Sequence, residues 1–220
     1  MQSGQSLKNF GRAAIRITVA GTVSRATGGK FANGAAYAAF MIAIKAGVNA
    51  YRDSVTDKFI ENNVKHFDSM DTDAEETALP EETRKALYRI GRTNSGHRAF
   101  NTAIESGNSV NLYRYMDQGF NSFMTWDYED GANDIIYTTD VQKWIEGNIQ
   151  HAIPQRQLES STLGSLLGHE FGHTSFGGSL EEIQATSIFE NDYRRTYGMP
   201  LVDGYDKSAP SGVCLYEERC

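Results

Sequence analysis

Cysteine is scarce in this sequence, and the shortage excludes one class of protein. The 220 residues include only two cysteines, Cys214 and Cys220, both within the last seven positions. Small secreted domains that depend on disulfides carry cysteines throughout the chain, so this chain is not a disulfide-built scaffold. The two thiols could close a small terminal loop in an oxidising compartment, or they could both be free near the chain end.

Basic charge is also in deficit. Lysine and arginine number 21 against 28 aspartates and glutamates, which gives a formal net charge of −7. A protein that binds the phosphate backbone of a nucleic acid needs a basic field. We therefore expect no nucleic acid partner.

No apolar run is long enough to cross a membrane as a helix. The most apolar stretch, GAAYAAFMIAIKAGV, contains Lys45 near its far end, and it is shorter than the roughly 20 residues that a span requires. Near the N-terminus, ITVAGTV is too short and too interrupted by glycine for a signal peptide. We expect no transmembrane span, and export would need another device.

The amino-acid composition along the chain predicts two parts. Residues 1–74 form an Ala/Gly-rich segment with a connecting helix, and residues 75–220 form the domain that carries the chemistry. Pro80 followed by two glutamates predicts a helix from Pro80 to Ile90, and GHRAFNTAIESG predicts another that ends at Gly107. SVNLYRYM, NSFMTWDYED and DIIYTTD then predict antiparallel strands, with a hairpin at EDGAND.

The stretch TLGSLLGHEFGHT predicts a helix that carries two histidines. Its leucines and Phe171 fill one arc of a helical wheel, and His169 and His173 lie one turn apart on the flank of that arc. Side chains at this spacing can both bind one Zn²⁺, while Glu170 projects beside the ion, where it can accept a proton from an attacking water. We interpret His169 and His173 as metal ligands and Glu170 as the general base.

Three glycines recur every fourth residue on the face of this helix away from the leucines: Gly164, Gly168 and Gly172. Each costs about 1 kcal/mol relative to alanine in a helix interior. We interpret the stripe as close packing of another backbone, with a crowded site as the alternative.

A zinc site needs a third protein ligand and an open position. SFGGSLEEIQATSIFENDYRRTYGMP predicts a second helix, capped by Ser179 and ending near Gly198 and Pro200. On its wheel Glu182 lies in the middle of an inward face with Ala185, Phe189 and Tyr193, while five residues point to solvent: Gln184, Ser187, Asn191, Arg194 and Arg195.

Glu182 is the first candidate for the third ligand, followed by Glu190 and then Glu181. Each of the first two has a rival explanation: Ser179 and Glu182 fit a capping box, and Glu190 could pair with Arg194. Two tyrosines beyond the helix, Tyr197 and Tyr205, could donate a hydrogen bond to an oxyanion, and we assign this role to Tyr205. The other histidines, His66, His97 and His151, have no partner at metal spacing, and we interpret them as surface or structural residues.

HEFGH, followed by EEIQATSIFENDYRRTYGMPLVDGY, resembles the effector-type zinc metallopeptidases of bacterial pathogens and the related toxin domains at the C-termini of Rhs-type polymorphic toxins. The shared pattern is H-E-x-x-H, then E-x-x-A-T, E-N, a basic residue, G-x-P-L and a tyrosine, matched here by Tyr205. GGKFANGAAYAAF resembles the segment that joins an Rhs shell to its toxin. The family usually has an arginine directly after Pro-Leu, where this chain has Val202.

The resemblance favours Glu182 over Glu190 as the third ligand. It also implies secretion by a specialised system into a target cell, a parent toxin shell or secretion machinery, and a cognate immunity protein.

The sequence thus predicts an α+β, zincin-like fold, with the metal helix packed under a small antiparallel sheet and mostly helical structure elsewhere. Within GANDIIYTTD we expect an edge strand that binds an extended substrate. The expected activity is that of a zinc metalloendopeptidase toxin, in which zinc-bound water attacks a peptide carbonyl with Glu170 as base. Two alternatives are an amidase or peptidase on cell-wall peptide, and a non-enzymatic toxin or adaptor module with a structural metal site.

Overall fold

A computed structural model of the chain describes residues 30–69, 74–114, 123–127, 133–148 and 159–202. The chain divides into two compact units, Met1–Ser54 and Val55–Cys220. The second unit begins before the boundary expected between residues 74 and 75, because Val55 and Phe59 are buried in the same hydrophobic core as the later elements.

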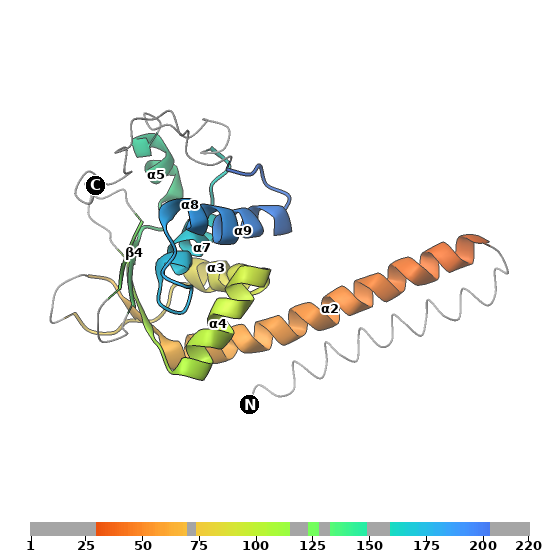
Figure 1. The fold of residues 1–220 in the computed structure, drawn as a ribbon, viewed down its shortest axis with the longest axis horizontal. Helices are drawn as coiled ribbons and strands as arrows, with labels where there is room; N and C mark the ends of the chain where they lie inside the picture. The colour runs from red at the N-terminus through yellow and green to blue at the C-terminus, as the bar shows by residue number, and fades with distance from the viewer. Residues whose placement is uncertain (1–29, 70–73, 115–122, 128–132, 149–158, 203–220) are drawn as a thin grey trace. The chain divides into compact units, whose positions relative to one another are not determined.

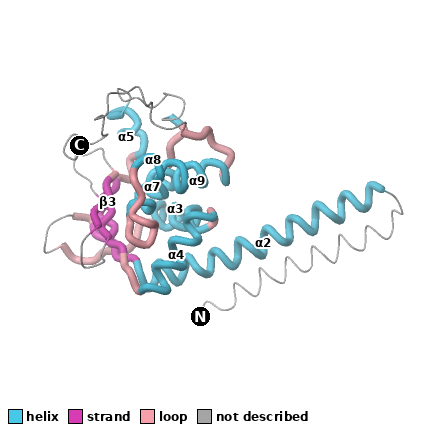
Figure 2. The backbone as a smooth tube through the Cα atoms, in the orientation of Figure 1, coloured by secondary structure: helices cyan, strands magenta, loops and turns pink. Residues whose placement is uncertain are grey.

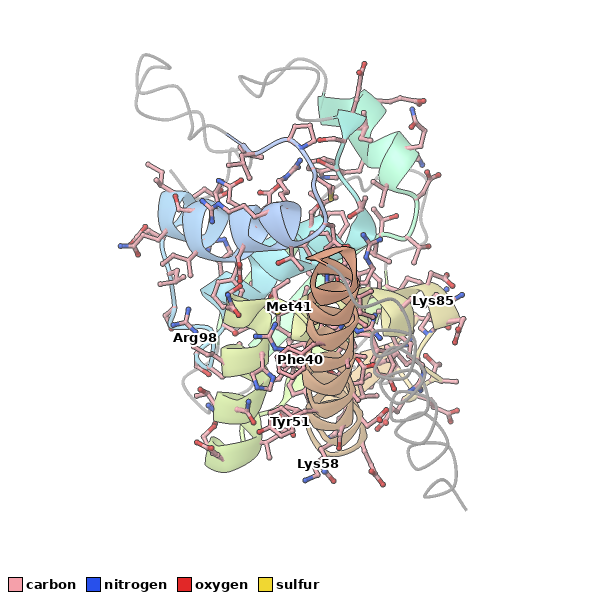
Figure 3. All side chains as sticks on the ribbon, turned by 90° about the vertical axis from the view of Figure 1, so that its right-hand side faces the viewer. Phe40, Met41, Tyr51, Lys58, Lys85 and Arg98 are labelled. Carbon is pink, nitrogen blue, oxygen red and sulfur yellow. The ribbon has the colours of Figure 1, made fainter. Side chains whose placement is uncertain are left out.

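The first described element is the long helix α2, Lys30–Asn63, of which the first unit contains the part up to Ser54. Alanine is abundant here and favours helix, but the apolar residues do not share one face. Large apolar side chains are exposed along this part, among them Phe40, Met41 and Tyr51 (Figure 3). Among the described residues, no helix has the length and apolar character to cross a membrane.

The two helices predicted before the strands are confirmed. Helix α3 spans Glu81–Gly91 after the N-cap residue Pro80. Helix α4 spans Asn94–Ser106; the Thr93 hydroxyl oxygen accepts a hydrogen bond from the Gly96 amide at its start, and Gly107 ends it with φ of 72°. A left-handed residue at this position favours glycine because it has no Cβ.

The sheet is mixed, so the prediction of a small antiparallel sheet is wrong. Its order is β1 (Val64–Phe67), β2 (Val110–Arg114), β4 (Asn133–Tyr137) and β3 (Met124–Asp127). β1 pairs with β2 and β2 with β4 in parallel, whereas β3 and β4 are antiparallel. Only the β3–β4 pair follows the expected direction.

The strand in GANDIIYTTD is also not an edge strand. This segment forms β4, which lies between β2 and β3, and β3 is at the edge of the sheet among the described strands. The interior position agrees with the burial of this strand. Ile135, Ile136 and Tyr137 are all buried, as expected for a strand that is covered on both faces.

The metal-motif helix is α7, Leu163–His173. The second predicted helix has three parts: α8 (Glu182–Ala185), the π-helical segment η1 (Thr186–Glu190) and α9 (Asn191–Thr196). Helix α5, Val141–Asn148, was not predicted. Within the second unit, α3, α4, α7, α8 and α9 lie on one side of the sheet (Figures 1 and 2).

Four phenylalanine rings anchor α7 in the core. Phe59 stacks on Phe100 with ring centroids 4.0 Å apart, and Phe171 meets both rings edge-on. Phe176, in the turn after α7, also contacts Phe59 and Phe171. Since aromatic burial fixes one face of α7, the rotation of this helix and the direction of its histidines are set by the core.

Candidate metal centre

Helix α7 begins with a reciprocal cap. The Thr162 hydroxyl oxygen accepts a hydrogen bond from the Ser165 amide at 3.2 Å, and the Ser165 hydroxyl oxygen accepts one from the Thr162 amide at 2.9 Å. This capping box satisfies two amides that have no partner inside the helix. The helix therefore begins directly after Thr162, the first residue of the stretch TLGSLLGHEFGHT from which it was predicted.

The two histidines of α7 present their Nε2 atoms to each other, 3.1 Å apart. The i, i+4 spacing places both rings on one side of the helix. His169 is buried, whereas the His173 side chain is 22% exposed. The pair therefore faces the edge of the core rather than its centre.

Glu182 reaches both rings from the first turn of α8. Its Oε1 lies 3.1 Å from His169 Nε2 and its Oε2 lies 3.2 Å from His173 Nε2. The predicted cap at Ser179 is wrong, and with it the rival capping box for Glu182: the N-cap residue is Glu181, whose amide donates to Gln184 Oε1. The Glu182 carboxylate is thus directed at the histidines and not back onto its own backbone.

His169, His173 and Glu182 together could hold a metal ion. Two atoms bound to one tetrahedral zinc at about 2.1 Å lie about 3.4 Å apart, and the three contacts above are close to that separation. Nitrogen and carboxylate oxygen are also ligands that zinc accepts. With Glu182 42% exposed, the group is open to solvent on one side, as a site with a free coordination position requires.

The charges of the surrounding side chains also favour a bound cation. Glu170, Glu182 and Glu190 surround the histidines, and in the described structure Arg194 forms an ion pair with Glu190. With both histidines neutral, as metal ligands are, three ionised carboxylates against one guanidinium leave two negative charges. A divalent cation would balance them, because buried charge is costly unless it is compensated.

The other ring nitrogens of the histidines also have partners. His173 Nδ1 lies 2.7 Å from the carbonyl oxygen of Leu180. His169 Nδ1 lies 3.3 Å from Thr186 Oγ1 and 3.4 Å from Glu190 Oε2. When Nδ1 carries the proton and donates it to such acceptors, Nε2 keeps its lone pair for a metal.

Glu190 therefore lies near the site, but its carboxylate oxygens are not among the candidate ligand atoms. Its Oε1 accepts from Arg194 Nε at 2.8 Å and lies 2.7 Å from Arg194 Nη2. For Glu190, a salt bridge to Arg194 was the alternative to metal binding, and the structure contains this salt bridge. It also adds the contact with His169, which the sequence analysis missed.

The π-helical segment explains two positions after Phe189 at which the wheel was wrong. Asn191 and Arg194 were expected to point to solvent, but both are buried. A π-turn contains more residues than an α-turn, so the residues after η1 are rotated relative to a regular α-helix. Glu190, Asn191 and Arg194 turn inward as a result.

Glu170 lies between α7 and the edge strand β3. Its side chain is buried, and its Oε2 accepts a hydrogen bond from the Thr125 hydroxyl at 2.7 Å. Thr125 Oγ1 also lies 3.0 Å from the Glu170 carbonyl oxygen. Thr125 was not predicted, because its position on one face of a short strand was the only signal in the sequence.

The electrostatics of these groups follow from burial and from one another. Burial raises the pKa of Glu170. For His169, burial lowers the pKa, but the contacts with Glu182 and Glu190 outweigh it and place the pKa well above its ordinary value. Glu190 shows the opposite balance: burial raises its pKa, and His169 and Arg194 together bring it below its ordinary value.

The glycine stripe of α7 packs against the second helix at two of its three positions. A Cβ at Gly164 would lie 2.3 Å from the Tyr193 hydroxyl oxygen, and one at Gly172 would lie 3.0 Å from the Ala185 Cβ. At Gly168 the nearest atom would be at 3.8 Å, which is ordinary contact. The predicted close packing of another backbone is confirmed at Gly172, where the Ala185 Cα would lie 3.2 Å away; at Gly164 the close neighbour is the Tyr193 side chain, and Gly168 has no close neighbour.

Three other candidate tyrosines and histidines that the structure describes, Tyr197, His66 and His97, do not join the cluster. Tyr197 donates its hydroxyl hydrogen to the Arg89 carbonyl oxygen. His66 is buried, and its two ring nitrogens lie within hydrogen-bond distance of Thr77 and Tyr137, in agreement with a structural role; His97 contacts Asn101. Tyr205, His151 and both cysteines lie outside the described residues.

Val202, which stands where the resembling family has arginine, has a structural role. Its side chain is buried, its amide donates to Asn191 Oδ1, and its carbonyl oxygen accepts from Asn191 Nδ2, both at 2.9 Å. Asn191 thus fixes the chain beyond α9 through two hydrogen bonds.

Comparisons with protein-family models, with curated proteins and with solved structures find no match for this chain.

Proposed function

We propose that the protein is a zinc-dependent metalloendopeptidase with a zincin-like arrangement of helix and sheet. The observation that carries the proposal is the convergence of His169, His173 and Glu182 from two helices, with Glu170 directly beside them. Zinc would be held by these three side chains and, when bound, would polarise a peptide carbonyl and lower the pKa of a water molecule.

Glu170 would accept a proton from the attacking water and later deliver it to the leaving amine. It is buried, and burial raises its pKa toward the range that suits proton exchange near neutral pH. Thr125 donates a hydrogen bond to one carboxylate oxygen and so fixes the side-chain rotamer. The other oxygen is the one that we expect to handle the proton.

An extended substrate would pair with β3. This strand is at the edge of the sheet among the described strands, and its Thr125 contacts Glu170. A peptide added to that edge would run alongside the histidines and gain backbone hydrogen bonds, which bind without regard to most side chains. The role of substrate-binding edge therefore moves from the GANDIIYTTD segment to β3.

Delivery as a toxin into a target cell, with an immunity protein and a parent shell, stays a prediction based on the sequence resemblance. Zinc peptidase activity is the part that the site supports, and it can be tested first.

Glu170→Gln is the direct test of this function. The amide keeps the volume and accepts a hydrogen bond from Thr125, but it cannot take up a proton, so we expect zinc content unchanged and proteolysis lost by at least about a hundredfold. Cleavage would be followed by mapping new protein termini in cells that express each variant. Glu105→Gln, an exposed change of the same chemistry on α4, is the control that should cleave like the wild type.

Proteolysis at the wild-type rate in Glu170→Gln would contradict the proposed function. Zinc binding without cleavage of any protein by the wild type would instead favour a structural metal site.

A further inference from the structure

The two candidate histidine ligands differ in what contacts their second ring nitrogen. His173 Nδ1 faces the neutral backbone carbonyl of Leu180, whereas His169 Nδ1 faces the carboxylate of Glu190 as well as the Thr186 hydroxyl. A carboxylate makes the imidazole a stronger electron donor than a neutral acceptor does. The more buried ring therefore has the stronger partner.

Glu190 divides its two oxygens between two tasks. Oε1 contacts Arg194 at 2.7 and 2.8 Å, and Oε2 lies 3.4 Å from His169 Nδ1. The side chain of Glu190 is only 9% exposed. Its carboxylate is thus held by an ion pair on one side and directed at the ring on the other.

Arg194 is itself fixed by groups outside the helix. Nη1 donates to Ser160 Oγ at 2.8 Å and to the Pro200 carbonyl oxygen at 3.0 Å, and Nη2 donates to Ser161 Oγ at 2.9 Å. The side chain is 1% exposed. The guanidinium links α9 to the segment before α7 and to the chain after α9, and it cannot follow Glu190 if the carboxylate moves.

We propose that Glu190, held in place by Arg194, is a positioning residue that fixes the ring of His169 with Nε2 facing the metal. The inference rests on the proposed function, because it assumes that the three-residue group binds zinc. The π-helical segment makes this contact possible, because Thr186–Glu190 winds more loosely than an α-helix. Glu190 therefore reaches His169, while Glu182, two turns earlier, reaches the same ring from the other side.

The test compares zinc affinity with the stability of the metal-free protein. Glu190→Gln removes the charge at nearly constant volume, and Glu190→Asp keeps the charge beside Arg194 but shortens the reach to His169. Zinc dissociation constants come from competition with a chromophoric chelator, and the absorption bands of bound Co²⁺ report the coordination geometry. Thermal unfolding of the chelator-treated protein measures stability without metal, and Glu105→Gln is the matched control.

We expect Glu190→Gln to bind zinc about 10- to 100-fold more weakly than the wild type, with altered Co²⁺ bands. Glu190→Asp should fall between the two, and it decides the matter if the glutamine variant does not fold. Glu105→Gln should bind like the wild type. Affinity loss that is fully accounted for by a lower unfolding temperature of the metal-free variants would overturn the proposal, because that is the result of a merely structural role.

The remaining outcomes separate the inference from the proposed function. Wild-type zinc affinity and Co²⁺ bands in both Glu190 variants overturn the inference alone and leave the three-ligand site intact. Absence of zinc binding by the wild type itself overturns both.

Discussion

At the scale of single residues, Thr125 controls the placement of the Glu170 carboxylate. Its hydroxyl donates to Oε2 at 2.7 Å across the interface between β3 and α7. The two residues are 45 positions apart in the chain, so no local pattern could predict the contact. The ligands His169 and His173, in contrast, are predictable because their i, i+4 spacing is a local property of one helix.

Replacing Thr125 by valine tests this contact. Valine keeps the shape but cannot donate, and a hydrogen bond to a charged group contributes about 1.5–3 kcal/mol, which corresponds to a fall in kcat of roughly ten- to a hundredfold. Zinc content should stay at the wild-type level. Thr125→Ser restores the hydroxyl and should recover most of kcat; steady-state kinetics that show equal rates for the valine and serine variants would refute this role.

At the scale of elements, the sequence predicted helices better than it predicted their neighbours. Pro80 marks the start of α3, Gly107 marks the end of α4, and Thr162 marks the start of α7. Strand pairing is a long-range property: β1 was missed, and the parallel pairing of Val64–Phe67 with β2 depends on chain segments that leave no periodic signal. The π-turn was not predictable either, because an apolar wheel assumes a constant rotation per residue.

Alanine in place of two glycines of α7 is expected to change the free energy of unfolding in opposite directions. Gly164→Ala places a Cβ 2.3 Å from the Tyr193 hydroxyl and should lower the free energy of unfolding by about 1–3 kcal/mol, as overpacking does. Gly168→Ala meets its nearest atom only at 3.8 Å and should raise the free energy of unfolding by up to about 1 kcal/mol. Urea unfolding measures both, and effects of the same sign would contradict the packing described for this face.

At the scale of the whole molecule, the candidate centre joins elements that are distant in the chain. His169 and His173 come from α7, Glu182 from α8, Thr125 from β3, and the buried Arg194 network from α9. Bound zinc would therefore stabilise the second unit as a whole, by about 4 kcal/mol when the ion is present at a thousand times its dissociation constant.

The choice of Glu182 over Glu190 as third ligand was the main alternative left by the sequence. The sequence ranked Glu182 before Glu190, and the three-dimensional contacts separate the two acids: Glu182 meets the two Nε2 atoms, and Glu190 meets a Nδ1 atom and Arg194. We therefore assign Glu182, and not Glu190, as the third candidate ligand.

Zinc content of the purified protein tests the claim most directly. Protein prepared without chelators and analysed by atomic emission should contain about one zinc per chain in the wild type and in Glu105→Gln, and much less in Glu182→Ala, because two histidines alone leave zinc short of its usual three protein ligands. A wild type without zinc whose unfolding temperature is unchanged by chelator would contradict the account, and so would a Glu182→Ala variant that retains one zinc per chain.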